Sequence, residues 1–441
     1  MGERRQCATQ STPSSHTNLR RRKMVRKSMI LLLCSLVLLT STGIVLAQDS
    51  INLVFLGRDG TYEEAMRVAI GQYEQLNPNV KIEYMGLPWS GLREKITIEL
   101  VEGRGDFDLI IIDDPWTSEF LPAGFLEDLG PWFEQTGKEL PDDFIDSLLN
   151  LGRWPYPDGS LYALPIVGNV QLFAYRSDLF EAQGLNHPPK TWTDVAAAAR
   201  MFSEESDTFG MVFRGARGND IVVSFLPILW AFGGDIIVDG QSGIDSPEFL
   251  AALKLFLELR NYAPGDVDTY QAARVREALM SGQAAMAVEV WPAWVPELDD
   301  PSASSVVGLF ELVKHPGQTA ESAPMLGPWL AGVTSTSNNK AAAFDFLTFM
   351  TSPEVQKMAA VEVGNPPTLA SLYTDPDLVA LYRWYPDQLE ALQNGVARPR
   401  TPLWSRVEDT LAGYLHEALV GISTPEAAMD AAHAAVSRIL R

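Results

Sequence analysis

Beyond the N-terminal fifty residues, short apolar runs alternate with longer segments whose apolar positions recur every three or four residues. The run 51–56 predicts a strand, and 61–77 predicts an amphipathic helix with Met66, Ile70 and Tyr73 on one face. Strand, helix and strand patterns then follow at 80–86, 90–103 and 107–113. This β-α-β-α-β order is typical of an α/β fold with a doubly wound sheet, in which ligands bind beyond the carboxyl ends of the strands.

A second α/β segment is predicted from about residue 161 onward. It contains a helix after the sequence PPKTW, with Thr191 or Thr193 as its N-terminal cap. Two more helices and a strand that ends in aromatic residues are predicted at 225–237, 246–260 and 284–294. The tail beyond residue 365 has a helical pattern, and no long linker separates the segments. The pattern therefore predicts two α/β units joined by short connections.

The first 47 residues have a different pattern. The cationic cluster Arg20–Lys27 precedes the largely apolar run Met29–Leu39 and small residues up to Ala47, which is the layout of a secretory signal peptide. The alternative is a membrane anchor, but this run of eleven positions is too short for a bilayer span of about 20 residues. We therefore expect residues 1–47 to direct export, with Met24 as an alternative translation start.

The N-terminal segment also holds both cysteines, Cys7 and Cys34, so the exported chain is expected to fold without disulfides. Lipid attachment at Cys34 is an alternative that the bulky Leu33 before it disfavours. Of 34 basic and 56 acidic residues, eight and one lie within 1–47, which leaves 26 against 55 and a net charge of −29. Such a charge disfavours nucleic acids and anionic membrane surfaces as partners and suits a neutral or cationic ligand.

Tryptophan is concentrated near predicted strand ends and carboxylates. Trp116 follows Asp113 and Asp114, which end a strongly apolar strand. An aromatic ring close to an acid or among small residues also occurs at Glu289, Trp291 and Trp329. For a single tryptophan, core filling is the ordinary explanation. A ring face beside a carboxylate, however, suits either a sugar or a cationic small molecule.

Paired carboxylates raise the alternative of a secreted glycosidase, whose two carboxyl groups flank the scissile bond about 5–9.5 Å apart. Adjacent strand residues point to opposite faces, so Asp113 and Asp114 are not expected to meet at one bond. The histidines are scattered, and no HExxH, GxSxG, P-loop or GxGxxG motif follows a strand. The sequence therefore favours binding over catalysis, with no metal and no cofactor expected.

Several stretches together resemble a known protein family. They are FDLIIIDDPWTSEFLPAGFLEDL, LYALPIVGNVQLFAYRSDLFEAQGL with PPKTW, FLPILWAFGGDI, AAMAVEVWPAW, GPWLAGVTSTSNNKAAAFDFLTFMTSPEVQ, and NPPTLASLYTDPDL with ARPRTPLW. In this order they resemble the family 1 extracytoplasmic solute-binding proteins of ABC importers, most of all the trehalose, maltose and polyol binders. The resemblance covers nearly all of 51–440 and implies a periplasmic-binding-protein type II fold, with two α/β lobes, a hinge and a ligand cleft between the lobes.

The resemblance also implies which positions contact the ligand. In the loop after the third strand these are Asp114 and Trp116, with Asp113 nearby. After the sequence LPI, where sugar binders often carry an acid or a tyrosine, this chain has Asn169, with Gln171 as a further donor. The remaining implied contacts are Glu64 or Glu63 of the first helix, Trp291 after Glu289, the turn Gly327-Pro328-Trp329, and Arg398 or Arg400 of the tail.

The expected organisation has a signal peptide region at 1–47. Lobe 1 is formed by 48–166 with about 312–365, and lobe 2 by about 167–311 with 366–441. The resemblance implies a monomeric binding protein that captures a disaccharide, oligosaccharide or polyol outside the cytoplasmic membrane and delivers it to the permease of an ABC transporter. Two alternatives remain open: a secreted glycosidase, and the same fold binding a cationic small molecule.

Overall fold

A five-stranded mixed sheet contains the predicted N-terminal strands. Its order is β2 (Val80–Leu87), β1 (Ile51–Arg58), β3 (Leu109–Asp113), β12 (Trp329–Val333) and β6 (Leu164–Val167). Strands β1, β2 and β3 run parallel, and β12 pairs antiparallel with both β3 and β6. Because β3 is buried on both faces along its whole length, it reads as a continuous apolar run rather than an alternating one.

The computed structural model describes residues 50–185, 187–322 and 324–441. Within it, Ile51–Arg441 form one compact unit. The expected signal peptide at 1–47, with its two cysteines, lies outside the described residues. In the part of the chain that the structure describes, every helix is too short or too polar to cross a membrane.

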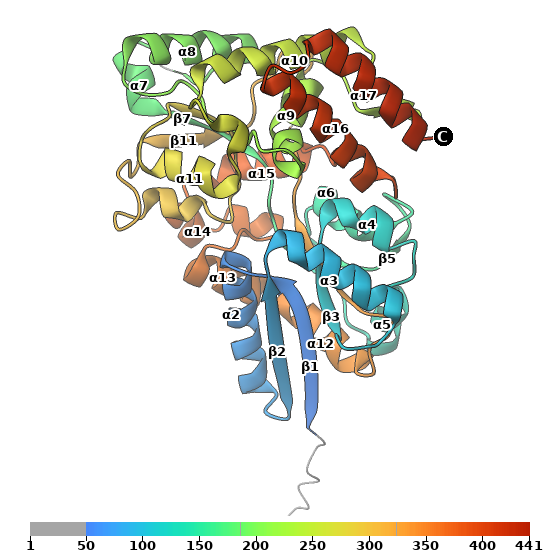
Figure 1. Cartoon of the computed structure of the whole chain (residues 1–441). Helices are drawn as coiled ribbons and strands as arrows, with labels where there is room; N and C mark the ends of the chain where they lie inside the picture. The colour runs from blue at the N-terminus through green and yellow to red at the C-terminus, as the bar shows by residue number, and fades with distance from the viewer. Residues whose placement is uncertain (1–49, 186, 323) are drawn as a thin grey trace, which may run out of the picture. The chain divides into compact units, whose positions relative to one another are not determined.

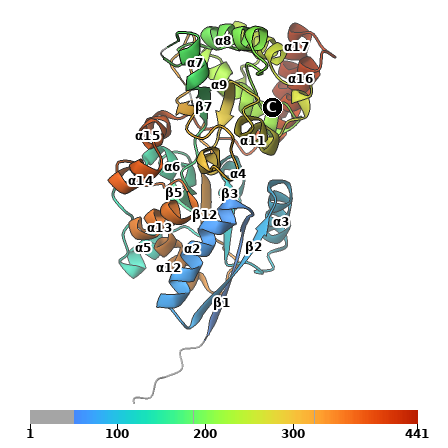
Figure 2. The same ribbon diagram turned by 90° about the vertical axis from the view of Figure 1, so that its left-hand side faces the viewer.

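Helices cover both faces of the five-stranded sheet. Helix α2 (Thr61–Leu76) packs with α12 (Lys340–Met350) and α13 (Pro353–Val363). Helix α3 (Trp89–Glu102) lies on the other side of the strands (Figures 1 and 2). The two connections run in opposite directions across the sheet, so right-handed crossovers place α2 and α3 on opposite faces. Shorter helices follow β3: α4 (Asp114–Phe120), α5 (Gly130–Thr136) and α6 (Asp146–Leu149).

A second, three-stranded sheet has the order β10 (Met286–Val290), β7 (Leu172–Arg176) and β11 (Phe310–Val313), and is antiparallel throughout. Its helices are α7 (Ser177–Ala182), α8 (Trp192–Glu205), α9 (Asn219–Ala231), α10 (Pro247–Leu259), α11 (Ala272–Met280), α16 (Trp404–Leu419) and α17 (Pro425–Ile439). Helix α9 packs against α10 and α16, and α16 against α17 (Figure 1). The expected cap at Thr191 is confirmed, because its side chain accepts a hydrogen bond from the Asp194 amide in a capping box.

The remaining elements are short. Two-residue hairpin strands form β4 (Arg153–Trp154) with β5 (Ser160–Leu161) and β8 (Ile237–Val238) with β9 (Gln241–Ser242). Single 3₁₀ turns are η1 (Asn150–Gly152), η2 (Arg260–Tyr262), η3 (Val267–Thr269), η4 (Val295–Asp299) and η5 (Ala370–Tyr373). Helices α14 (Pro376–Leu381) and α15 (Tyr385–Asn394) lie between η5 and α16.

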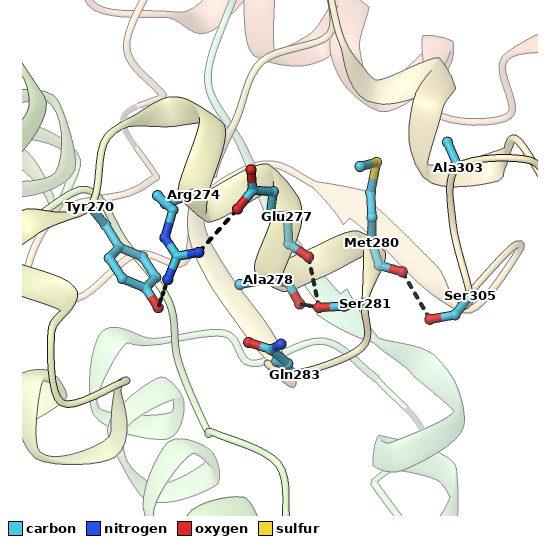
Figure 3. A pocket seen from close by; sticks show the side chains of 9 residues that line it. All are labelled: Tyr270, Arg274, Glu277, Ala278, Met280, Ser281, Gln283, Ala303 and Ser305. Atoms are coloured by element: carbon cyan, nitrogen blue, oxygen red, sulfur yellow. Dashed lines mark hydrogen bonds and ion pairs between the residues drawn. The ribbon is translucent and has the colours of Figure 1, made fainter.

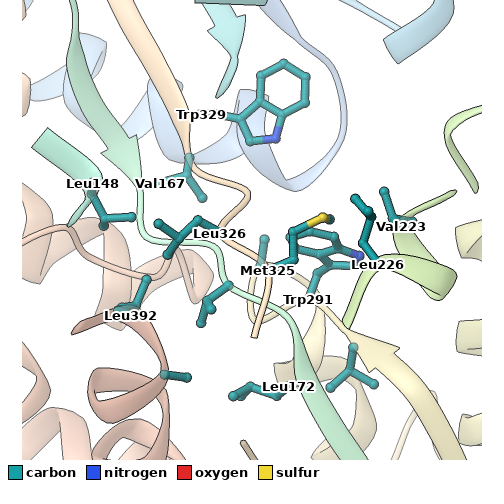
Figure 4. Packing of buried hydrophobic residues seen from close by; sticks show 14 of the residues in the cluster. Leu148, Val167, Leu172, Val223, Leu226, Trp291, Met325, Leu326, Trp329 and Leu392 are labelled. Atoms are coloured by element: carbon teal, nitrogen blue, oxygen red, sulfur yellow. The ribbon is translucent and has the colours of Figure 1, made fainter. Parts of the chain in front are cut away.

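Three segments connect the two sheets, and they are hydrogen-bonded to one another. Val170 forms an antiparallel bridge with Leu326, and Met325 forms a parallel bridge with Val396. The Gln171 amide donates to the Met325 carbonyl at 2.9 Å, and the Leu326 amide to the Val396 carbonyl at 3.0 Å. Apolar side chains, Met325 and Leu326 among them, pack around these segments (Figure 4). We call this three-segment ladder the hinge.

The expected division into lobes stays a prediction, and strand membership refines its boundaries. Val167 belongs to the five-stranded sheet, whereas β11 joins the three-stranded sheet as far as Val313. In the tail, Leu369 bridges Phe144, next to α6. The tail segment beyond residue 366 therefore contacts both halves of the fold before α16 and α17 join the second sheet.

Candidate functional site

One edge of the five-stranded sheet gathers most of the expected site residues. Strands β1, β2, β3 and β6 all end at this edge, and the antiparallel β12 begins there, with Trp329 paired to Asp113 and Val167. In parallel sheets, this carboxyl edge is where ligands bind. The residues at or near these strand ends are Tyr62, Trp89, Asp113, Asp114, Trp116, Asn169, Gly327 and Trp329.

Four aromatic rings form a continuous chain at this edge. The ring centroids of Trp89 and Trp116 are 5.6 Å apart, those of Trp116 and Trp329 5.9 Å, and those of Trp329 and Tyr62 5.4 Å. Trp116 also contacts Phe120 and is only 2% exposed. We had expected Trp116 to stack on a ligand, but its ring is covered by neighbouring rings. In this structure it supports Trp89 and Trp329, and Trp89 and Tyr62 are the less buried members of the chain.

Asp113 and Asp114 meet at one arginine. The Trp89 indole donates to Asp113 Oδ2 at 2.9 Å, and the Asp114 amide donates to Asp113 Oδ1 at 3.0 Å. Arg398 hydrogen-bonds Asp114 and lies 3.4 Å from Asp113 Oδ1. The expectation that the two carboxylates point apart was wrong, because β3 ends at Asp113 and helix α4 begins at Asp114. Strand alternation therefore does not extend across the pair.

The arginine is shared with a third buried acid. Glu408 of α16 accepts a hydrogen bond from the Asn219 amide group at 2.8 Å and interacts electrostatically with Arg398. Burial raises the pKa of Asp114 to about 6 and that of Glu408 to about 7, and Arg398 opposes both shifts. Asp114 Oδ2 is buried without a hydrogen-bond partner among the described residues, which leaves an acceptor oxygen for another donor.

A second acid–arginine pair comes from the other sheet. Glu289, on β10, accepts a hydrogen bond from the Ser224 hydroxyl at 3.0 Å and lies 3.1 Å from Arg214 Nε. Burial raises the pKa of Glu289 to about 7, against the Arg214 charge. The Arg214 guanidinium lies over the Trp291 ring, 5.6 Å from its centroid. We call these residues and those at the sheet edge the cluster: Tyr62, Trp89, Asp113, Asp114, Trp116, Asn169, Arg214, Glu289, Trp291, Gly327, Trp329 and Arg398. Asp113, Asp114 and Glu289 each face an arginine.

Asn169 joins the two sides of the cluster through protein contacts. Its side-chain amide donates to the Tyr62 hydroxyl at 3.2 Å and accepts from the Ala293 amide at 3.2 Å. Its carbonyl accepts from the Gly327 amide at 3.1 Å. The expected contact of the Asn169 amide with a ligand stays a prediction: each end of the amide bonds a protein partner, and one N–H of its nitrogen is left for a ligand.

Gly327 provides space for a tryptophan. A Cβ atom at this position would lie 2.2 Å from Cζ3 of Trp291 and 2.6 Å from its Cη2. The φ angle of Gly327 is not positive, so the requirement for glycine here comes from close approach and not from backbone conformation. The turn before Trp329 therefore contacts the ring of Trp291 directly, through the backbone of Gly327.

Glu64 is not brought to the cluster. It lines a shallow surface depression between α2 and α13, beside Arg67 and Glu362, and Glu63 pairs with Arg67. The residue of α2 that reaches the cluster is Tyr62. Sequence reasoning missed it, although Tyr62 precedes Met66 by four residues and so shares the apolar face of the helix.

Trp89 and Arg214 were also missed. Trp89 follows β2, so the strand-end rule that identified Trp116 would have found it too. Arg214 lies in a loop with no distinctive motif, and only the fold brings it to Trp291. A further depression beside α11, lined by Tyr270, Arg274 and Glu277 among others, shares no lining residue with this site, and these three side chains bond one another (Figure 3).

Comparison with known proteins shows which family the chain belongs to. The family profile described as bacterial extracellular solute-binding protein matches residues 59–357, which is more than half of the chain. The chain belongs to this family. The chain is similar to a probable ABC transporter-binding protein of Deinococcus radiodurans, which is 29% identical over 64% of this chain and 69% of its own length.

Two other solute-binding proteins resemble the chain over longer stretches. The mannitol-binding protein of Pseudomonas aeruginosa is 28% identical over 70% of this chain and 71% of its own. The structure of maltose-bound MalE3 of T. maritima is 28% identical and superimposes with a TM-score of 0.80, covering 88% of this chain and all of that chain. This match confirms the expected two-lobed α/β fold.

Proposed function

We propose that this solute-binding protein captures a neutral sugar or polyol outside the cytoplasmic membrane and presents it to the permease of an ABC importer. The observation that carries the proposal is the composition of the cluster, in which aromatic rings lie beside three carboxylate groups that each face an arginine. Rings supply faces for the C–H surface of a sugar, and the paired carboxylates keep acceptor oxygens for its hydroxyls. The ligands named for the mannitol-binding and maltose-bound relatives support the same class.

The charge balance of the cluster argues against a cationic ligand. A cation bound through aromatic rings and acids needs carboxylates whose charge is not already neutralised. Here the charges of Arg398 and Arg214 offset two of the three negative charges of Asp113, Asp114 and Glu289, which leaves less attraction for a cation than the acids alone would give. The strongly negative charge of the chain is instead carried by its surface. A hydroxyl can donate to Asp114 Oδ2 and accept from an arginine without disturbing either pair.

Ligand entry requires the two sides of the cluster to separate, because Tyr62 (α2) and Trp329 (β12) lie beside the five-stranded sheet, whereas Arg214 and Trp291 lie beside β10 of the three-stranded sheet. The hinge ladder, through which the chain passes three times, is the place for such a motion. A ligand drives closure only if it binds the closed arrangement more tightly, so contacts from both sides are needed. Residues 1–47 are proposed to direct export, and the protein is proposed to act as a monomer without catalytic activity.

A thermal-shift screen tests the proposal. The purified chain from residue 48 is heated alone and with maltose, maltotriose, mannitol, choline or glutamate, each at about 100 times a micromolar dissociation constant. A ligand that binds only the folded state stabilises it by about 2.7 kcal/mol under these conditions, which is a shift of several degrees. We expect a shift with one of the neutral compounds. A shift with choline or glutamate alone, or release of glucose from maltose, would overturn the assignment.

A further inference from the structure

We propose that Arg214 is a specificity-determining residue that hydrogen-bonds a hydroxyl of the neutral ligand. This inference rests on the proposed function and assigns the contact on the side of the three-stranded sheet. Asn169 is a weaker candidate for this ligand contact, because its amide group already hydrogen-bonds Tyr62 and the Ala293 amide.

The fold brings Arg214 to the cluster from a loop. Val212 bridges Ala287 in parallel, so the chain here runs beside β10 and emerges at the same end as Glu289 and Trp291. The Arg214 amide then donates to the Ser224 hydroxyl at 3.1 Å, which ties the loop to α9. The backbone of the loop is thus fixed, and the side chain extends over Trp291.

The donors of Arg214 are uncommitted in a mostly buried position. A guanidinium carries five N–H donors. Within the residues that the structure describes, those of Arg214 approach only Glu289 at 3.1 Å and Asp220 at 3.7 Å, and neither contact has hydrogen-bond alignment. The side chain is 12% exposed, so water reaches little of it. Among its nitrogen atoms, Nε is buried without a hydrogen bond and faces Glu289, whereas the two terminal NH2 groups are available to a ligand oxygen.

The other arginines near the cluster are already engaged. Arg398 hydrogen-bonds the Asp113 and Asp114 carboxylates. Arg400 donates to the Asp114 carbonyl at 2.9 Å and to the Thr117 hydroxyl. Arg214 differs from both because it has ion-pair partners but no hydrogen bond from its guanidinium among the described residues.

The neighbouring polar atoms define the chemistry that fits. The Trp291 indole N–H is buried without a partner in the described part of the chain, and Glu289 Oε1 has only its ion pair. The three groups offer donors from Arg214 and Trp291 beside one acceptor from Glu289. A pair of neighbouring hydroxyls matches this set, because each hydroxyl both donates and accepts. An ammonium group does not match it, since it has no acceptor for the guanidinium.

The ordinary explanation for Arg214 is that it only neutralises buried Glu289. That role predicts a loss of stability on replacement, but it predicts no dependence on individual ligand hydroxyls. The two roles are therefore separated by measuring affinity for ligands that lack one hydroxyl at a time.

The experiment uses maltose and its monodeoxy derivatives, or mannitol and its deoxy derivatives, according to which compound binds the wild-type protein. Calorimetric titrations compare wild type, Arg214→Lys and Arg214→Gln. A charged hydrogen bond predicts that Arg214→Gln weakens binding of the parent compound by roughly tenfold or more. We expect this loss to disappear for the one derivative that lacks the hydroxyl contacted by Arg214, and Arg214→Lys to fall between the two.

Arg274→Gln serves as the matched control, because Arg274 is half exposed on α11 and its own partners are Tyr270, Asp266 and Glu277. Its affinities should equal those of wild type. If wild type binds neither maltose nor mannitol in any form, the proposed function fails. If wild type binds but Arg214→Gln loses nothing, or loses the same factor for every derivative, only the role of Arg214 is overturned. Should Arg214→Gln not fold, Arg214→Lys supplies the same comparison.

Discussion

At the scale of single residues, contact with Trp291 makes Gly327 the most constrained position of the cluster. The backbone of residue 327 approaches the edge of the indole so closely that no Cβ atom fits. The contact joins the start of β12 in one sheet to the end of β10 in the other. The position of Trp291 relative to Trp329 therefore depends on the absence of a side chain.

We predict that Gly327→Ala displaces Trp291 and weakens ligand binding at least several-fold. Overpacking of this kind costs about 1–3 kcal/mol. Calorimetric titration with the ligand found by thermal shift, together with the unfolding temperature, measures both effects. Gly71→Ala is the matched control, because Gly71 lies in α2 with nothing within 4 Å of a Cβ atom and should gain slightly in helix stability. Unchanged affinity in Gly327→Ala would contradict the prediction.

The same scale shows what sequence reasoning finds and misses. Trp329, Trp291 and Asp114 were predicted because they follow or begin strongly patterned strands. Glu64 was placed wrongly, since a charged residue near the start of a helix gives no sign of which way it faces. Arg214 was missed because its role arises only where a loop passes β10. Residues fixed by local pattern are visible in the sequence, and residues fixed by packing of distant segments are not.

At the scale of elements, the hinge couples three chain segments through Asn169 and its neighbours. The side-chain amide of Asn169 connects Tyr62 at the start of α2 with the loop after β10, and the Asn169 carbonyl accepts a hydrogen bond from the Gly327 amide. With 1% of its surface exposed, the side chain has no access to water as an alternative partner. Asn169 thus positions both sides of the cluster.

We predict that Asn169→Ala lowers the unfolding temperature and weakens ligand binding together. The substitution leaves the Ala293 amide unsatisfied, at a cost of about 1–3 kcal/mol. Tyr62→Phe is the milder comparison, because it removes one hydroxyl and keeps the ring beside Trp329. Scanning calorimetry and titration give both quantities. Retention of wild-type stability by Asn169→Ala would show that these hydrogen bonds contribute little.

Elements were predicted best where the pattern is local. The β-α-β-α-β order and the cap at Thr191 follow from periodicity and capping chemistry. Helix α9 was predicted at 225–237 but spans Asn219–Ala231, because eleven of its residues are buried and no polar face marks its beginning. The insertion of β12 between β3 and β6 joins segments far apart in sequence, and no local signal announces it.

At the scale of the whole molecule, buried acids influence how stability depends on pH. Burial raises the pKa of Glu289 and Glu408 to about 7 and that of Asp114 to about 6. An acid with a raised pKa in the folded state binds protons there that the unfolded chain does not bind between about pH 4 and 7. Acidification within this window therefore stabilises the fold. His315 acts in the opposite direction, because burial lowers its pKa to about 4.

We predict a higher unfolding temperature at about pH 5.5 than at about pH 8. In this range the three acids whose pKa is raised to about 6 or 7 stabilise the fold on acidification by more than His315, whose pKa is lowered, destabilises it. Glu408→Gln removes one of the three groups and should reduce the difference between the two pH values. Scanning calorimetry at matched ionic strength measures both proteins. A wild-type unfolding temperature that falls steadily from pH 8 to pH 5.5 would contradict the prediction.

The place of β12 has a consequence for the nascent chain. Strands β3 and β6 border β12 on either side, yet β12 comes long after both in the sequence. Until residues 329–333 have left the ribosome, the N-terminal half keeps two strand edges open and cannot complete its sheet. Premature folding is thereby delayed until most of the polypeptide has been synthesised. If residues 1–47 direct export as proposed, a chain that completes its sheet late is still unfolded when translocation begins.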